Sequence, residues 1–205
     1  TGLMGNLGDA KYLASTSIAT SVMTLIIWSF GFLRMGTVGI VAQLYAKSDY
    51  REIARTIIRN FLLATFISFI IILFHPFIID LVKKNFQTSS ETQELIKTYI
   101  SVRVLSIPAE FIIYILVGFF LGIQKTNISS LLVIILSALN IIFSSFFVLS
   151  LNLNVFGVVL GTLLASYITA IVFSLFTYRF IITKFQITPT FQRLIVLSKL
   201  LKLIT

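Results

Sequence analysis

The sequence predicts an all-α protein, a bundle of about five helices that cross a membrane. Hydrophobic residues make up 58% of the 205 positions, charged residues only 11%, and the mean hydropathy is +1.03. Soluble domains average about 45–50% apolar and about 25% charged residues. A chain of this length could not hide so much apolar surface in water. The composition therefore excludes a soluble enzyme and a disordered chain, and the lack of cysteine excludes a disulfide scaffold.

Five apolar stretches are long enough to span a bilayer, which takes about 20 residues in a helix. They are too long for barrel strands and lack the in–out alternation of such strands. Within lipid, a helix satisfies its own backbone groups. The predicted spans cover residues 13–44, 53–82, 95–121, 128–151 and 155–182.

The connections between these spans are short and polar. A charged segment follows the first span, a Ser/Thr-rich segment the second, a tight turn the third, and a polar turn without charge the fourth. After the fifth span, Lys184 and Pro189 end the apolar pattern. Residues 186–205 are apolar but carry three cations, which predicts a cytoplasmic interfacial helix or an inter-lobe linker.

The basic residues divide unequally between the two ends of the predicted bundle. Lysine and arginine accumulate in cytoplasmic loops of membrane proteins. The richer end, which we expect in the cytoplasm, carries Lys47, Arg51, Arg55, Arg59, Lys125, Arg179, Lys184, Arg193, Lys199 and Lys202. The poorer end carries Lys11, Lys83, Lys84 and Lys97. We therefore attribute the net charge of +9 to the lysines and arginines of the cytoplasmic loops, and we expect no nucleic-acid partner.

This topology places the first twelve residues outside, with no signal peptide to carry them there. We therefore expect a further helix before Thr1 and read the chain as part of a longer protein. Six spans with both ends in the cytoplasm would form one lobe of a transporter built from two repeats. The expected partners are the lipid bilayer, this first helix and a C-terminal lobe.

Polar residues inside the first span lie on one helix face, because their spacing alternates between four and three. This face either packs against another helix through small residues or forms a wall of a wet cavity. Trp28 and Met35 suit the binding of flat apolar compounds. Arg34 lies about 15 Å from the cytoplasmic end of a straight helix, from the rise of 1.5 Å per residue. The face comprises Ser17, Ser21, Thr24, Trp28, Gly31 and Met35.

The third span contains Arg103 and Glu110, which we expect to be too far apart for a direct pair because they are seven residues apart. Glu110 is the only carboxylate well inside a span. It is either a proton carrier or the partner of a cation on another helix. Pro108 interrupts the same span and frees a backbone carbonyl.

Spans four and five are predicted to be antiparallel neighbours, so Asn140, Ser144 and Thr162 can meet. Their oxygens suit either a structural hydrogen bond or a small cation or proton network. No catalytic or metal-ligand set appears in the sequence, and no ATP-binding loop. The chain is therefore expected not to be an enzyme, to need no cofactor and to use no ATP directly.

Residues 28–37 and 39–43, WSFGFLRMGT and GIVAQ, closely resemble the WGFGFLRMGTTGLAAQ stretch of multidrug and toxic compound extrusion (MATE) transporters of the DinF-like branch. Residues 1–8 are similar to the end of that family's first helix. Arg103, Pro108 and residues 118–124 are similar to its fourth helix. The resemblance covers essentially the whole chain and implies helices two to six of a twelve-helix, two-lobe transporter.

The resemblance also implies site residues. The family's cation site in this lobe uses an Asp late in helix one, an Asn-x-x-x-Asp pair in helix five and a Thr in helix six. Asn140 and Thr162 match the Asn and the Thr, whereas Ser144 replaces the second Asp and Ser166 stands where an acidic residue is common. The predicted cation or proton site is Asn140, Ser144, Thr162 and Glu110. The predicted substrate cavity is Trp28, Met35, Gln43, Tyr99, Tyr114 and Arg34.

The resemblance implies a secondary active antiporter in the cell (inner or plasma) membrane. It would export cationic or amphiphilic compounds in exchange for H+ or Na+ by alternating access. Two alternatives stay open from the sequence. One is a flippase for lipid-linked oligosaccharides with the same fold, for which Arg34 and Arg103 could bind pyrophosphate. The other is a partial membrane protein that transports nothing.

Overall fold

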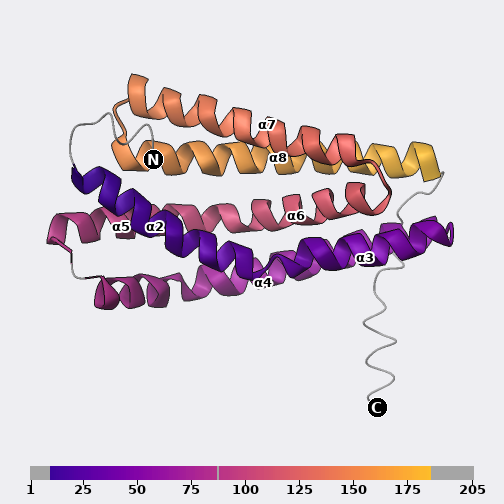
Figure 1. The fold of residues 1–205 in the computed structure, drawn as a ribbon, viewed down its shortest axis with the longest axis horizontal. Coiled ribbons are helices and arrows are strands. Elements are labelled where there is room, and N and C mark those ends of the chain that lie inside the picture. Colours follow the sequence, from indigo (N-terminus) through magenta and orange to yellow (C-terminus); the bar gives the residue numbers. More distant parts are fainter. Residues whose placement is uncertain (1–9, 87, 186–205) are drawn as a thin grey trace, which may run out of the picture.

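The structure is a computed structural model that describes residues 10–86 and 88–185. Its helices run along one direction and are joined by short turns (Figure 1). Five helices or helix pairs are long and apolar enough to cross a membrane. The predicted all-α bundle of about five spans is therefore confirmed, while the predicted segment 186–205 lies outside the described residues.

The first span is divided into α2 (Ala10–Ser29) and α3 (Phe32–Ala46). At the junction the Gly31 N–H donates to the Trp28 carbonyl at 2.9 Å, the bond of a tighter turn. Among the residues between the two helices, Gly31 has the lowest helix propensity. The sequence predicted one continuous span here, and the short turn between the two helices is a departure from it.

The second span is α4 (Tyr50–Asn85), which begins at a clear cap. The Asp49 side chain accepts a hydrogen bond from the Glu52 N–H at 3.1 Å, which satisfies a free donor of the first turn. Farther along, the Asn60 amide donates to Thr37 Oγ1 at 2.9 Å and ties α4 to α3. Much of the remaining α4 surface is exposed phenylalanine and leucine, as expected of a helix that faces lipid.

The third span is the most deeply buried and holds the bundle together. It consists of α5 (Ser90–Arg103), a 3₁₀ turn (Val104–Ser106) and α6 (Ile107–Gly122). Pro108 lies in the first turn of α6, where a missing N–H costs little. A Cβ on Gly118 would lie 2.8 Å from the Arg34 carbonyl oxygen, so α3 and α6 approach more closely than larger residues would allow.

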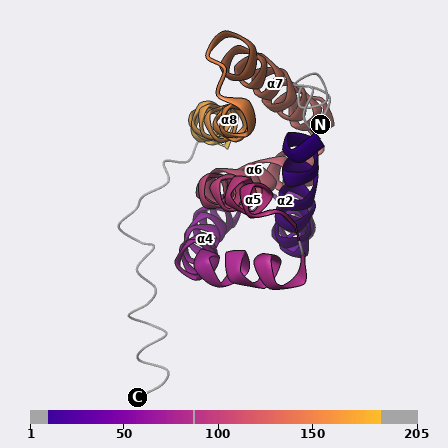
Figure 2. The same ribbon diagram turned by 90° about the vertical axis from the view of Figure 1, so that its left-hand side faces the viewer.

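The last two spans form a pair. They are α7 (Thr126–Ser145), extended by a π-turn (Phe146–Ser150), and α8 (Asn154–Phe185). A Cβ on Gly161 would lie 2.5 Å from the Ser144 nitrogen, so the two backbones are in close contact. Seen along the bundle axis, this pair lies beside the group formed by α2 to α6 (Figure 2).

Candidate functional site: a polar cavity between α6, α7 and α8

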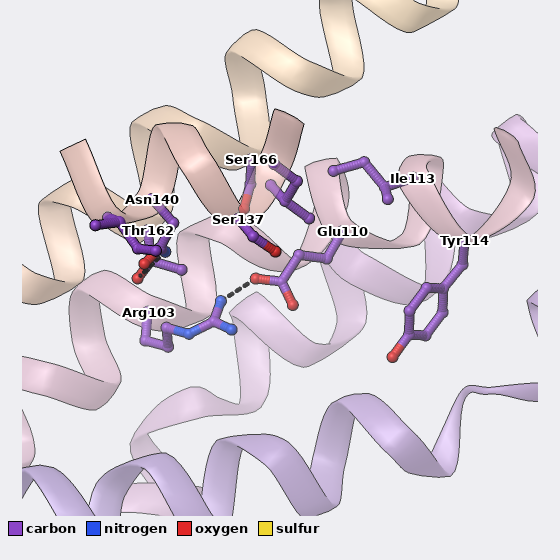
Figure 3. A pocket seen from close by; sticks show the side chains of 10 residues that line it. Arg103, Glu110, Ile113, Tyr114, Ser137, Asn140, Thr162 and Ser166 are labelled. Atoms are coloured by element: carbon purple, nitrogen blue, oxygen red, sulfur yellow. Dashed lines mark hydrogen bonds and ion pairs between the residues drawn. The ribbon is translucent and has the colours of Figure 1, made fainter. Parts of the chain in front are cut away.

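A cavity of about 340 Å³ opens where the α7–α8 pair meets the third span. We call it the α6–α8 cavity (Figure 3). It is notable because its wall is partly polar, although the helices around it are strongly apolar. It is lined by Arg103, Glu110, Ile113, Tyr114, Leu136, Ser137, Asn140, Ile141, Thr162 and Ser166.

Arg103 and Glu110 form an ion pair in this cavity, between Nη1 and Oε1. The two side chains are only 15% and 13% exposed. Ser106 lies between them, with Oγ 3.0 Å from Glu110 Oε1 and 2.7 Å from the Arg103 carbonyl oxygen. The sequence-based expectation that these residues are too far apart was wrong. Both side chains are long, and the 3₁₀ turn between them alters the helical register that the expectation assumed.

Asn140 and Thr162 lie on the opposite wall and join α7 to α8. The Asn140 amide donates to Thr162 Oγ1 at 2.9 Å, and that hydroxyl donates to the Val158 carbonyl at 3.1 Å. This hydrogen bond confirms the prediction that the two residues can meet. Ser144 is buried one turn farther along α7, and its hydroxyl points to the same carbonyl at 3.4 Å. It is not among the cavity residues.

The residues predicted for a substrate cavity are dispersed. Tyr114 lines the α6–α8 cavity, and the Arg34 guanidinium lies 5.8 Å from its ring centroid. Tyr99 is buried and accepts a hydrogen bond from Thr20 at 3.0 Å. Trp28 and Met35 are 75% and 70% exposed, and Gln43 is also exposed. The structure therefore brings Tyr114 and Arg34 near the cavity. Tyr99 does not line it, but its side chain interacts with that of Arg103, which does. Trp28, Met35 and Gln43 lie away from it.

The polar face of the first span does not pack inside the described bundle. Ser21, Thr24, Trp28 and Met35 are all exposed, and no described helix covers them. The sequence left two interpretations open, that this face packs against another helix or that it lines a cavity. Both need a surface opposite the face, and the described residues do not provide one. The face is available to another part of the protein.

Two contributors to the site, Ser106 and Tyr167, were not predicted from the sequence. Ser106 is uncharged, so its residue type did not mark it. Ser166, which stands where related proteins often have an acidic residue, lines the cavity. Tyr167 donates from α8 to the Leu105 carbonyl in the 3₁₀ turn at 3.0 Å. The sequence did carry a signal, because Pro108 predicts a loosened carbonyl nearby. Within residues 10–86 and 88–185, no cluster of His, Asp and Glu could hold a metal ion by itself.

Comparison with known proteins gives one consistent result. The model of the MatE family matches residues 1–146. DNA damage-inducible protein F of Escherichia coli (strain K12) is 30% identical over 172 residues, which are 84% of this chain and 38% of that protein. The probable multidrug resistance protein NorM of Listeria monocytogenes serovar 1/2a is 24% identical over 148 residues, 72% of this chain and 32% of that protein.

Solved structures agree on the fold. A crystal structure of a MATE mutant matches with a TM-score of 0.77 and 20% identity, over 89% of this chain and 41% of that one. An inward-facing multidrug resistance MATE family transporter of the MOP superfamily matches with a TM-score of 0.72 and 20% identity, over 98% of this chain and 48% of that one. The chain thus spans less than half the length of these relatives. It is an integral membrane protein that belongs to the MatE family.

Proposed function

We propose that this chain is the N-terminal lobe of a secondary active exporter of drugs or toxic compounds in the cell membrane. Members of the MatE family are secondary transporters and not enzymes. Two relatives carry the name multidrug resistance in their descriptions. The chain spans 38% of its Escherichia coli relative, which leaves room in such a protein for a further helix and a second lobe.

The observation that carries the proposal is the α6–α8 cavity itself. Polar groups inside a membrane are costly, so they concentrate at substrate or ion pathways. This cavity holds a buried ion pair and a hydrogen-bonded Asn140–Thr162 pair on opposite walls. An alternating-access transporter needs such a site near the middle of the membrane.

Export then proceeds by exchange. A cationic or amphiphilic compound binds between the lobes, and the binding of H+ or Na+ in the outward-open state weakens the binding of that compound. The ion gradient supplies the free energy, and the difference in affinity for the compound between the two states couples its export to the ion. Asn140, Ser144, Thr162 and Glu110 form the proposed ion site, and Tyr114 and Arg34 border the proposed substrate path.

The alternative flippase function gains no support from the cavity. It would need several free arginines for pyrophosphate. Arg103 is already neutralised by Glu110, which leaves Arg34 as the one arginine near the cavity without an ion pair among the described residues.

The test is dye efflux from membrane vesicles that contain the whole natural protein. We expect a cationic dye to be expelled when a proton or sodium gradient is imposed, and efflux to stop when the gradient is collapsed. The substitution N140A should reduce efflux at least about tenfold, the scale of one lost polar contact in a transport step. R59Q at the water edge is the matched control. Absence of gradient-driven efflux from a folded protein, together with flipping of a labelled lipid, would reject the proposal.

A further inference from the structure

We propose that Arg103 determines the ion selectivity of the α6–α8 cavity, because its guanidinium acts as a built-in counter-ion of Glu110 that excludes Na+. The inference rests on the proposed function, since it names the ion that this cavity does not bind. Among the described residues that line the cavity, Glu110 carries the sole negative charge and Arg103 cancels it.

The one carboxylate that lines the described cavity is not free to bind a metal cation. A metal cation that leaves water needs a compensating charge, because desolvation is costly in a low dielectric. Glu110 Oε1 is already engaged by Arg103 Nη1 and by Ser106 Oγ. Both partners belong to the same span as Glu110, so the backbone of one span holds the arrangement. Na+ could use this carboxylate only by displacing the guanidinium.

The neutral oxygens of the Asn140–Thr162 pair and Ser144 are also engaged in hydrogen bonds. Thr162 Oγ1 accepts from Asn140 and donates to the Val158 carbonyl, so its hydrogen-bonding capacity is largely used. Ser144 points to that same carbonyl and does not line the cavity. Hard cations bind sets of several oxygen ligands, usually with carboxylates among them. The described wall of the cavity therefore offers neutral oxygens to a cation, but no negative charge that is not already paired with Arg103.

A second cation lies beside the cavity wall. The Arg34 guanidinium does not line the cavity but lies 5.8 Å from the ring of Tyr114, which does. A sodium ion in the cavity would therefore be repelled by Arg103, and Arg34 adds positive charge beside Tyr114. Charge–charge interactions are strong inside a membrane protein because little water screens them. Removing Arg103 should turn the same cavity into an anionic, oxygen-lined site.

The experiment measures binding of radioactive sodium to the purified whole protein in detergent, with potassium at equal ionic strength as competitor. It is done at about pH 8, above the range in which carboxyl groups titrate in water. The readout is the part of sodium binding that E110Q abolishes. This difference isolates the cavity from sodium sites elsewhere in the protein.

We expect no Glu110-dependent sodium binding in the wild-type protein. In R103Q we expect Glu110-dependent binding at sodium concentrations at least about tenfold below the highest at which the wild type shows none, the scale of one charge interaction in a partly buried site. R103K keeps the positive charge and should behave like the wild type. R103M removes the charge without adding a polar group, and serves if R103Q does not fold.

Two results would overturn the inference. One is sodium binding in the wild type that E110Q removes, which can be measured whatever the variants do. The other is a folded R103Q or R103M protein that binds no more sodium than the wild type. Because the assay needs no transport, it separates the two proposals. Missing efflux with the expected binding pattern rejects the proposed function alone.

Discussion

Two arginine–glutamate pairs in this chain have the same spacing of seven residues but different surroundings. Arg59 and Glu52 lie near the start of α4, where the Arg59 side chain is 53% exposed and its Nη1 is 2.6 Å from Glu52 Oε1. Arg103 and Glu110 lie inside the bundle. Exposed pairs stabilise proteins by at most about 1 kcal/mol, whereas breaking a buried pair costs about 3–5 kcal/mol. The surroundings, more than the geometry, decide what such a pair does.

The largest expected effect comes from breaking the buried pair. R103A leaves Glu110 without its partner, so the free energy of unfolding should fall by about 3–5 kcal/mol. The double variant R103M/E110Q has no buried charge and should recover most of that loss. Thermal unfolding of the purified whole protein checks both. If R103A were as stable as the wild type, the buried pair would be no different from the exposed one.

The close packing of α3 against α6 gives the next effect. In G118A the new methyl group would meet the Arg34 carbonyl oxygen at 2.8 Å and the Thr37 Cβ at 2.9 Å. Overpacking of this kind costs about 1–3 kcal/mol. In G39A, within α3, the methyl group meets nothing within 4 Å and should leave stability nearly unchanged. Equal melting temperatures for the two variants would refute the close contact of α3 and α6.

A neutral hydrogen bond in the same cavity should matter less for stability than the ion pair. T162V removes the acceptor of the Asn140 amide, and interhelical hydrogen bonds in membranes average about 0.6 kcal/mol. We expect a small drop in stability but a clear loss of efflux in the dye assay. T162S keeps the hydroxyl and should retain efflux. A T162V protein with normal efflux would remove Thr162 from the proposed ion site.

The smallest effect is expected at the exposed pair. R59Q removes this pair and leaves the second pair of Glu52, with Arg55, in place. It should lower stability by less than about 1 kcal/mol, and added salt should reduce the difference further. The Debye length falls from about 10 Å at 0.1 M salt to about 3 Å at 1 M. The effect of R103A should not depend on salt in this way, because the buried charges are poorly screened. Unfolding curves at low and high potassium chloride concentration measure both dependences.

The sequence predicted the number and order of the spans because bilayer thickness sets the length of apolar runs. The turn between α2 and α3 was not predicted, since one glycine in an apolar run does not by itself end a helix. The Arg103–Glu110 pair was not predicted either. The expectation considered side chains three or four residues apart on a helix, which are direct neighbours. The ion pair of Arg59 and Glu52 also joins residues that are seven apart.

Asn140 and Thr162 were placed together correctly, because a short turn makes consecutive spans antiparallel neighbours. The cavity that they share with Glu110 needed the structure, since three spans contribute to it. That the six predicted substrate residues act together stays a prediction. Trp28, Met35 and Gln43 face away from the described bundle, so sequence spacing alone could place them on a surface but not against a partner.

The buried ion pair also bears on how the protein is made. Each charged residue at the middle of a helix adds about 2.5–3.5 kcal/mol to the cost of entering the bilayer from the translocon. Arg103 and Glu110 lie in one continuous span, so they can neutralise each other as soon as that segment is helical. The segment can then enter the membrane as a neutral unit without waiting for α7 and α8 to be synthesised. Arginine and glutamate placed on two different spans would each have to enter the membrane alone.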